Sequence, residues 1–303
     1  MPARVIIDTD FHMDVDDVGA LAVAHALADR GDLNVLAVML NTPSEWGAPA
    51  IDIVNRWAGR RLPIGVLPQT NDAVPDPEYA MALVARFGAA VDLPTEPAVA
   101  LYRRLLSQAE PASLTLVSIG FFDNLMALLD SEADDIAPQT GRELIRLAVR
   151  RTVVMGGVFP QGREFNFVGH VALTHRFLED WPVSVDFVGF EVAAGLITGS
   201  DLSSVLGPNH PVAFAYATYN SGEGGRDSWD PLTVLVASET ETYVWSEPCR
   251  VSIDADGVDT FEFTAVGPHR IMLPLSDPAT TSAKIDDLLA SSRSSSLGYG
   301  GHL

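Results

Sequence analysis

The chain alternates between short apolar runs and longer stretches in which apolar residues recur every three or four positions. The short runs predict β-strands and the longer stretches predict α-helices. The strands predicted for the first two thirds of the chain are Val5–Asp8, Asn34–Leu40, Leu62–Leu67, Leu114–Ile119, Thr152–Met155 and Val183–Phe187. The predicted helices are Asp17–Arg30, Ala48–Ala58, Tyr79–Arg86, Ala98–Gln108, Asp123–Leu129, Arg142–Val149 and Glu191–Leu196. This alternation predicts an α/β fold with an open, mostly parallel, Rossmann-like sheet that carries helices on both faces.

The last third of the chain changes character. Three short segments alternate like antiparallel strands, namely Tyr243–Trp245, Arg250–Ile253 and Thr260–Phe263, and a closing helix is predicted over Pro278–Ala290. Residues 292–303 are rich in Ser and Gly, which predicts a disordered tail. No Pro-, Gly- or Ser-rich linker divides the rest of the chain. We therefore expect one domain over residues 1–291, with a small antiparallel C-terminal addition.

Composition and charge narrow the range of partners. The chain has 40 acidic and 19 basic residues and a formal charge of −21, which repels the phosphate backbone of nucleic acids. No apolar run approaches the ~20 residues that a membrane span needs. The single Cys249 cannot form an internal disulfide, and residues 1–20 show no signal-peptide pattern, so a cytoplasmic protein is predicted. A small neutral or cation-dependent substrate fits this balance better than a nucleic acid.

Five aspartates lie within ten residues at the end of the first predicted strand: Asp8, Asp10, Asp14, Asp16 and Asp17. Their carboxylates repel each other, and a hard cation such as Ca²⁺ or Mg²⁺, which prefers oxygen ligands, would remove that cost. Capping of the helix that follows accounts for one or two of them, not five. Ligands of open parallel sheets bind beyond the carboxyl ends of the strands. The run therefore predicts a metal site at the end of the first strand.

Two known aspartate-rich motifs fit only poorly. An EF-hand loop needs Gly at its sixth position, where registers starting at Asp8 and Asp10 place Met13 and Val15. The Asp-x-Asp after a strand also resembles the first motif of haloacid-dehalogenase-like phosphatases, which implies Mg²⁺, with Asp8 as nucleophile and Asp10 as acid/base. That family needs a lysine, and the only lysine is Lys284, in the predicted closing helix. This phosphatase remains the alternative hypothesis.

A third resemblance covers more of the chain. Val5-Ile6-Ile7-Asp8-Thr9-Asp10, followed by Asp16-Asp17, resembles the opening motif of the inosine–uridine-preferring nucleoside hydrolases, a strand followed by Asp-x-Asp-Pro-Gly-x-Asp-Asp. Here the turn is two residues longer. Further matches follow in the family's order: the strand, turn and helix of 116–125, Met155-Gly156-Gly157, Glu164-Phe165-Asn166 and Trp229-Asp230-Pro231-Leu232. Any one of these matches alone is weak, but together they are fairly specific.

The resemblance implies a Ca²⁺-dependent enzyme that hydrolyses the N-glycosidic bond of ribonucleosides. The implied Ca²⁺ ligands are Asp10, Asp17, Asp230 and the backbone carbonyl of Asp123. Asp10 is also the implied base that deprotonates the attacking water. Four residues resemble those that bind the ribose hydroxyls in the family: Asp16, Asn41, Glu164 and Asn166.

The residues expected to meet the leaving base differ from those of the family's best-known branch. That branch has His immediately before the late Asp, whereas this chain has Trp229, which resembles the purine-preferring branch, in which aromatic rings stack on the base. Trp46 is a second stacking candidate. His12 is a candidate proton donor, because the neighbouring carboxylates favour its charged form. The Gly-rich segment before Trp229 predicts a mobile loop, and Arg226 at its end is expected to touch base or ribose.

Two further expectations follow from the resemblance. Family members usually assemble as dimers or tetramers, so a homodimer or homotetramer that binds a small-molecule ribonucleoside is implied. A relative that binds ribonucleosides without cleaving them also stays open, because the His is missing and the first turn is longer than in the family.

Overall fold

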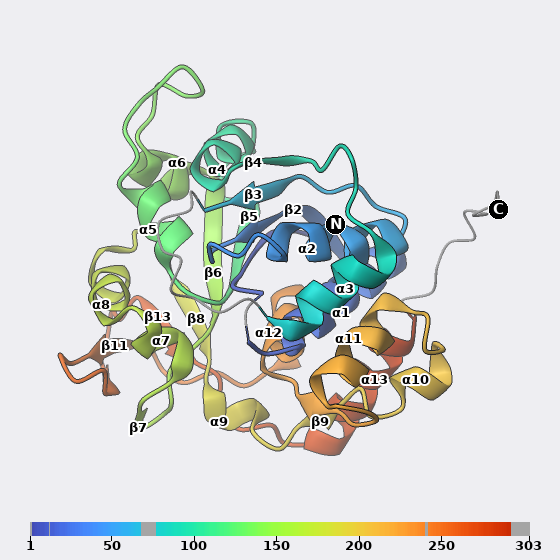
Figure 1. Ribbon diagram of the computed structural model, residues 1–303. Coiled ribbons are helices and arrows are strands. Elements are labelled where there is room, and N and C mark those ends of the chain that lie inside the picture. Colours follow the sequence, from blue (N-terminus) through green and yellow to red (C-terminus); the bar gives the residue numbers. More distant parts are fainter. Residues whose placement is uncertain (1, 12, 68–76, 240–241, 292–303) are drawn as a thin grey trace.

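One sheet of eleven strands forms the centre of the computed structural model, which describes residues 2–11, 13–67, 77–239 and 242–291 (Figure 1). In spatial order the strands are β4 (Thr95–Pro97), β3 (Ile64–Val66), β2 (Leu33–Leu40), β1 (Ala3–Thr9), β5 (Leu114–Ile119), β6 (Val149–Met155), β8 (Val185–Val188), β13 (His269–Ile271), β11 (Cys249–Ile253), β12 (Asp259–Phe263) and β7 (Gln161–Gly162). Neighbours from β4 to β13 are parallel, and the pairs beyond β13 are antiparallel. The predicted fold class is confirmed, and the antiparallel addition extends the main sheet.

Helices cover both faces of this sheet. Val5 and Ile7 of β1 share a core with α1 (Asp16–Arg30), α2 (Gly47–Trp57), α3 (Glu78–Phe87), α11 (Pro211–Tyr219), α12 (Trp229–Ser238) and α13 (Pro278–Ser291). Ile6, which points to the opposite face, shares a core with α4 (Ala98–Ser107), α5 (Asp123–Leu129), α6 (Gly141–Ala148) and α8 (Val171–Asp180). Short elements complete the chain: α7 (Phe165–Gly169), α9 (Phe190–Ala193), α10 (Leu202–Val205), β9 (Ile197–Thr198) and β10 (Arg226–Asp227).

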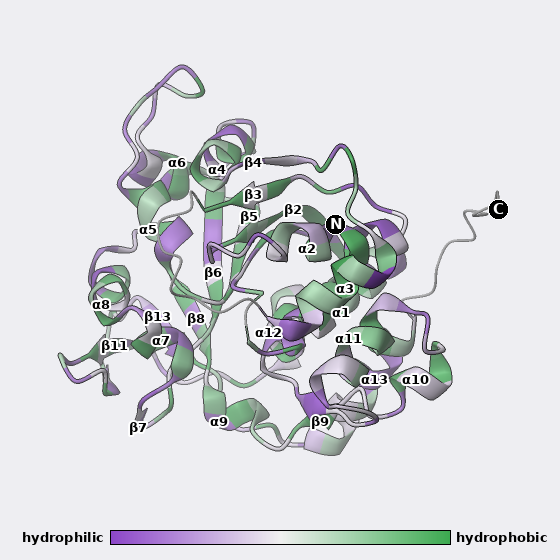
Figure 2. Cartoon of the chain, viewed as in Figure 1, coloured by the Kyte–Doolittle hydropathy of each residue, from purple (hydrophilic) through white to green (hydrophobic). Residues whose placement is uncertain are grey.

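The central strands are apolar because both of their faces are covered. All six residues of β5 are buried, and Figure 2 shows β5 and β8 coloured mostly as hydrophobic, whereas purple gathers in loops and on helix surfaces. Strands buried on both faces read as continuous apolar runs rather than as alternating patterns. This property explains why the sequence locates the central strands well.

Several predicted elements differ from the structure. Tyr243–Trp245 is not a strand; Trp245 forms only an isolated bridge with Met272. The helix predicted over Glu191–Leu196 is a four-residue turn of helix at α9. Helices α8, α11 and α12 and strand β13 were not predicted. Residues 292–303, predicted to be a disordered tail, lie outside the described residues. No described helix is long and apolar enough to cross a bilayer.

The strand order reverses direction between β1 and β5, which creates the crevice where ligands of such sheets bind. From β1 the chain continues outward to β2, and from β5 it continues in the opposite direction to β6. The two strand ends approach closely at Gly120. A Cβ atom there would lie 2.5 Å from the backbone nitrogen of Asp10. Only glycine therefore permits this approach, which places the aspartate turn against the end of β5.

Candidate functional site

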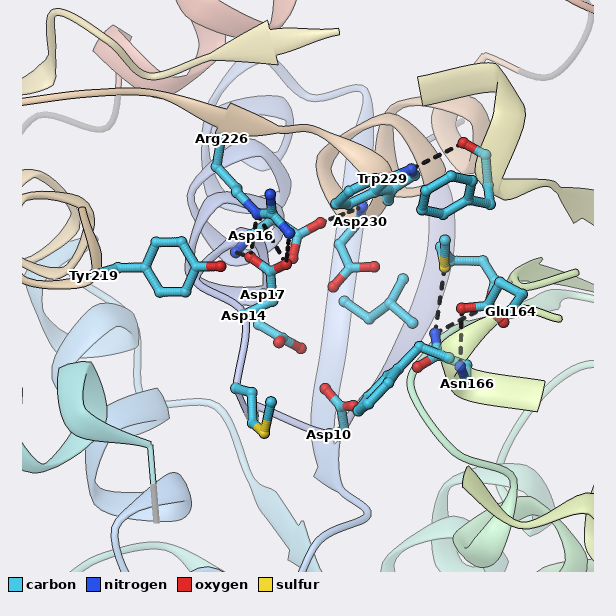
Figure 3. Close-up of a pocket in the computed structure, with 15 residues that line it drawn as sticks. Asp10, Asp14, Asp16, Asp17, Glu164, Asn166, Tyr219, Arg226, Trp229 and Asp230 are labelled. Atoms are coloured by element: carbon cyan, nitrogen blue, oxygen red, sulfur yellow. Dashed lines mark hydrogen bonds and ion pairs between the residues drawn. The ribbon is translucent and has the colours of Figure 1, made fainter. Parts of the chain in front are cut away.

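A cavity of about 310 Å³ lies at this crevice. It is lined by three groups of side chains that are far apart in the sequence (Figure 3). The first turn contributes Asp10, Met13, Asp14, Asp16 and Asp17. The segment after β6 contributes Glu164, Phe165 and Asn166, and the segment of β10 and α12 contributes Arg226, Trp229 and Asp230. Ile119, Met155, Phe190 and Tyr219 complete the wall.

Local hydrogen bonds fix the first turn. The hydroxyl group of Thr9 and the backbone N–H of Phe11, at 3.1 Å, both donate to Oδ1 of Asp17. Phe11 has a φ of 40°, in the left-handed region that side chains rarely adopt. Its ring is fully buried and contacts the ring of Tyr79 edge-on at 5.6 Å. This burial holds the backbone in an unfavourable conformation, so that Asp17 turns back toward the end of β1.

Three buried carboxylates meet where α1 and α12 begin. Carboxylate oxygens of Asp16, Asp17 and Asp230 all lie within 4.8 Å of one another. The backbone N–H of Asp230 donates to Oδ2 of Asp16 at 3.1 Å. Each of the three residues is at most 5% exposed. Packing of α1 against α12 therefore brings together acidic side chains that are 214 residues apart in the sequence.

Burial gives these carboxyl groups unusual acidities. It is the largest cause that raises the pKa of Asp16, Asp17 and Asp230 well above the ordinary value, and neighbouring carboxylates raise these pKa values further. Burial also raises the pKa of Asp10 to about 7, with a hydrogen bond from Asp17 acting in the opposite direction. The charged forms are therefore costly in the ion-free protein.

The donor set fits a hard divalent cation. Clustered carboxylate oxygens are the ligands that Ca²⁺ and Mg²⁺ prefer, and a cation would offset the repulsion among Asp16, Asp17 and Asp230. The geometry differs from the sequence-based ligand set in one respect: Asp16 belongs to the tightest group, whereas Asp10 lines the cavity beside it.

Glu164 and Asn166 form a rigid polar corner on the other side of the cavity. Glu164 caps α7 and accepts hydrogen bonds from the backbone N–H groups of Gly157, Asn166 and Phe167 at 2.8–3.3 Å. Burial nevertheless raises the pKa of Glu164 to about 7. The side-chain amide of Asn166 donates to the carbonyl oxygen of Met155 at 3.3 Å. Both side chains are thus fixed in orientation toward the cavity (Figure 3).

Trp229 and Arg226 form the remaining wall. The indole N–H of Trp229 donates to the carbonyl oxygen of Phe190 at 2.9 Å, and the two rings stack with centroids 5.0 Å apart. The guanidinium of Arg226 lies 4.8 Å from the ring centre of Trp229. It also pairs with the carboxylate of Asp14. Hydrogen bonds from this pairing raise the pKa of Arg226 above its ordinary value.

Comparison with known proteins identifies the fold. No protein-family model and no curated protein sequence matches the chain. Among solved structures, a plant nucleoside hydrolase matches with a TM-score of 0.74 and 17% identity, over 97% of this chain and 100% of the other. The inosine-uridine preferring nucleoside hydrolase from Bacillus anthracis matches with a TM-score of 0.71 and 15% identity, over 96% and 100%. The chain has the nucleoside hydrolase fold.

A third structure with this fold is the purine-preferring ribonucleoside hydrolase from Gardnerella vaginalis, with a TM-score of 0.68 and 16% identity. It is covered over 99% of its length, and this chain over 96%. At such low identity the likeness concerns the fold, and the residues of the cavity carry the functional argument. Most of the residues predicted from the sequence line one cavity. This placement is an observation separate from the similarity to the solved structures.

Three predicted residues are placed elsewhere. The amide of Asn41 is used inside the fold, where it donates to Oδ1 of Asp8 at 2.5 Å and to the carbonyl of Phe121 at 3.0 Å. The side chain of Asp123 contacts His170 at 3.2 Å, and Trp46 packs against the core. Asn41, Asp123 and Trp46 are not among the described residues that line the cavity, and their roles stay predictions. His12 lies outside the described residues.

The phosphatase alternative is wrong on this geometry. Its nucleophile, Asp8, is fully buried and bound by the hydroxyl group of Tyr102 at 2.7 Å and by Asn41. Lys284 pairs with Glu239 at 2.6 Å and lines a different cleft, at the start of β1 and β6. Neither group reaches a common substrate, so Asp8 supports the turn and does not act on a phosphate.

The sequence assigned no site role to seven residues that line the cavity: Met13, Asp14, Ile119, Met155, Phe165, Phe190 and Tyr219. Phe165 lies inside the Glu-Phe-Asn match, so its position was readable as part of that motif. Phe190 and Tyr219 belong to segments with no matching motif. The partnership of Asp14 with Arg226 joins residues 212 positions apart, and no local pattern in the sequence signals it.

Proposed function

We propose that the protein is a Ca²⁺-dependent hydrolase of the N-glycosidic bond of ribonucleosides, with a preference for purine bases. The observation that carries this proposal is the meeting of Asp16 and Asp17 with Asp230 in one cavity, opposite the polar corner of Glu164 and Asn166. A cation site beside fixed hydrogen-bonding groups suits a ligand rich in hydroxyl groups, and ribose is such a ligand. The nucleoside hydrolase fold supports the same conclusion.

Asp10, Asp17 and Asp230 would hold the proposed ion, with the carbonyl of Asp123 as a further ligand. When bound, Ca²⁺ supplies a positive charge that orients ribose hydroxyls and makes a neighbouring water more acidic. Because Ca²⁺ takes six to eight oxygen ligands, these protein groups would leave coordination positions for water and ribose hydroxyls.

Asp10 is the proposed general base. Asp10 lines the cavity beside Asp17 and Asp230, so its carboxylate can reach a water bound there and accept a proton from it. Asp10 takes a proton from the water that attacks the anomeric carbon, while the bond from that carbon to the base nitrogen breaks. The transition state resembles an oxocarbenium ion, and the surrounding carboxylates stabilise its positive charge.

Asp16, Glu164 and Asn166 are proposed to hold the ribose. Their oxygen and nitrogen atoms face the cavity from two opposite sides, so together they can fix the orientation of the sugar (Figure 3). Fixing the reacting atoms in place lowers the entropic part of the barrier. Because Glu164 is itself held by three backbone N–H groups, the sugar would meet a rigid partner.

The aromatic wall supports the purine preference. Phe165, Phe190, Tyr219 and Trp229 line the cavity, and stacking on such rings contributes about 0.5–1.5 kcal/mol beyond burial. A purine, with two fused rings, offers more stacking surface than a pyrimidine. Trp46, His12 and Arg226 stay candidate contacts of the base.

The proposal is tested by incubating Ca²⁺-loaded protein with purine and pyrimidine ribonucleosides and measuring free ribose. We expect ribose release, faster from purine ribonucleosides, and loss of release in Asp10→Ala. Wild-type rates in Asp10→Ala would exclude Asp10 as the base. Tight nucleoside binding without ribose release would instead indicate the non-catalytic relative. Size-exclusion chromatography with light scattering tests the implied homodimer or homotetramer.

A further inference from the structure

The cavity is electrically asymmetric. Six of the fifteen residues that line it are acidic, and Arg226 is the one cationic side chain among the described residues that line it. Figure 3 shows Asp10 and Arg226 at opposite ends of the view, with Asp16, Asp17 and Asp230 nearer to Arg226. Cleavage of a glycosidic bond separates charge in the same sense, because the sugar becomes positive and the leaving base becomes negative.

Asp14 holds Arg226 in a fixed orientation. The Nε atom of Arg226 donates to both carboxylate oxygens of Asp14 at 2.9 Å, and Nη2 donates to Oδ2 at 2.5 Å. Asp14 is itself anchored, since its Oδ1 accepts from the backbone N–H of Val15 at 2.7 Å. The guanidinium also lies over the rings of Trp229, at 4.8 Å, and Tyr219, at 5.7 Å. A planar group held by a bidentate pair and by ring contacts is well oriented.

The pairing leaves donors of Arg226 available. A guanidinium has five N–H donors, of which Asp14 takes the one on Nε and one on Nη2, and Asp227 takes one on Nη1 at 3.3 Å. The other N–H groups of Nη1 and Nη2 have no protein acceptor among the described residues. Because arginine stays protonated at all ordinary pH values, these groups can stabilise negative charge but cannot deliver a proton.

We propose that Arg226 stabilises the negative charge that develops on the leaving base, and that Asp14 is the positioning residue for Arg226. This inference rests on the proposed function. As the bond from the anomeric carbon to the base breaks, its electron pair stays on the base nitrogen, and the water oxygen bonds to the anomeric carbon. The proton of the water passes to Asp10. The base leaves as an anion hydrogen-bonded to Arg226 and takes a proton from solvent.

This arrangement fits two departures of the chain from the family pattern. Trp229 occupies the position where the best-known branch has a His, so the chain needs another group that assists the leaving base. The first turn is two residues longer than the family's, and Asp14 lies within that lengthened turn. The longer turn thus supplies the carboxylate that holds Arg226 over the cavity.

The test compares two substrates with different leaving groups. Inosine releases a base that needs help to depart, whereas 4-nitrophenyl riboside releases a stable anion without help. We expect Arg226→Gln to lower kcat for inosine roughly 100-fold, as loss of one transition-state hydrogen-bond donor does in other enzymes, and to change kcat for the nitrophenyl substrate less than about threefold. Asp14→Asn should lower kcat for inosine about tenfold with little change in KM, since a misplaced group loses only part of its effect.

Coupling between the two residues gives a second readout. If Asp14 acts through Arg226, the double variant should be no slower on inosine than Arg226→Gln alone, because interacting residues are not additive. Both side chains are partly exposed, 28% and 29%, and such ion pairs add little to stability, so the variants are expected to fold. Arg270→Gln is a matched control, since Arg270 pairs bidentately with Asp186 and lies 5.0 Å from the ring of Trp245, away from the cavity.

The rates of these variants on the two substrates either support or overturn the proposed role of Arg226. Selective loss on inosine with a non-additive double variant supports the proposal. Equal loss on both substrates, an unchanged rate in Arg226→Gln, or multiplied effects in the double variant would overturn it while ribonucleoside hydrolysis stands. If the wild-type protein releases ribose from neither substrate, the proposed function fails, and this inference fails with it.

Discussion

At the scale of single residues, the site is defined by carboxylates that the fold holds close together at a cost. Burial raises the pKa of Asp16, Asp17 and Asp230, which means that the charged form of each is costly in the ion-free protein. No hydrogen bond donated to the Asp230 carboxylate is found among the described residues, whereas Asp17 accepts from Thr9 and Phe11. We therefore expect a bound cation to stabilise the charged form of Asp230 more than those of Asp16 and Asp17.

Replacing Asp230 with Asn should affect stability and activity in opposite directions. We expect Asp230→Asn to raise the melting temperature of the ion-free protein at about pH 8, because it removes one of the mutually repelling charges. Ribose release should fall more than about 100-fold, since even changes behind the ligands of a metal cost 10–100-fold. Calorimetry and a ribose assay measure the two effects, with the exposed Asp135→Asn as control. A lower melting temperature in the ion-free variant would contradict the repulsion argument.

At the scale of elements, the approach of two strand ends positions the proposed base. The turn after β1 meets the end of β5 at Gly120, where an added Cβ would lie 2.5 Å from the nitrogen and 2.8 Å from the Cβ of Asp10. Neither neighbour is the far end of a flexible side chain. The position of Asp10 therefore depends on the absence of a side chain at residue 120.

Gly120→Ala tests this dependence. Overpacking of this kind typically costs about 1–3 kcal/mol of unfolding free energy, and displacement of Asp10 should slow ribose release as well. Gly31→Ala is a useful contrast, because Gly31 has a φ of 81° but open space around it at the end of α1. That variant should lose stability in denaturant titrations and keep its rate. Equal activity of Gly120→Ala and wild type would show that the strand ends can separate without moving Asp10.

The sequence predicted some elements well and others not at all, for physical reasons. Helix α1 has an apolar core-facing run and ends at Gly31, which has the left-handed conformation typical of helix C-termini. Helix α12 was missed, because nearly all of its residues are buried and their apolar pattern has no helical period. Helix α11 is likewise apolar. It begins at Pro211, and a proline in a sequence can indicate the end of a helix as well as its first residue.

The sequence likewise predicted the site residues that lie in local motifs and missed those that depend on contacts between distant segments. Asp17, Glu164, Asn166 and Asp230 lie in short motifs, and the structure brings all four to one cavity. Contacts between distant segments were beyond the sequence. The amide of Asn41 is used by Asp8 and Phe121, which depends on how β1, β2 and β5 lie side by side. Such pairings are set by the packing of the whole sheet and leave no local pattern.

At the scale of the whole molecule, the carboxylates make the stability of the ion-free protein depend on pH. The pKa values of Asp10 and Glu164 are raised to about 7, and those of Asp16, Asp17 and Asp230 are also raised. A group with a raised pKa binds more protons in the folded state than in the unfolded state. Stability is therefore lost as the pH rises through the folded-state pKa.

Two buried histidines act in the opposite sense, at lower pH. Burial lowers the pKa values of His25 and His269 to about 4, so they destabilise the fold as the pH falls below their ordinary value of 6.5. Above about pH 6.5 they are mostly neutral in both states, and the carboxylates dominate. The informative window therefore lies between about pH 6.5 and about pH 8.5.

We expect the melting temperature in the presence of a chelator to fall between about pH 6.5 and about pH 8.5. Saturating Ca²⁺ should raise the melting temperature more at the higher pH, because the ion binds the charged carboxylates of the folded state. Thermal unfolding at both pH values, with chelator and with Ca²⁺, measures the effect. A chelated protein that is as stable at the higher pH as at the lower would contradict the raised pKa values of these carboxyl groups.

We propose that acidic side chains up to 214 residues apart in the sequence hold one divalent ion, and that cleavage of a ribonucleoside needs this ion. Titration of chelator-treated, dialysed protein with Ca²⁺, with ribose release from inosine as the readout, tests it most directly. We expect no release without Ca²⁺ and a rise that ends at one Ca²⁺ per chain. Full release from the ion-free protein, or saturation with Ca²⁺ without any release, would contradict the account.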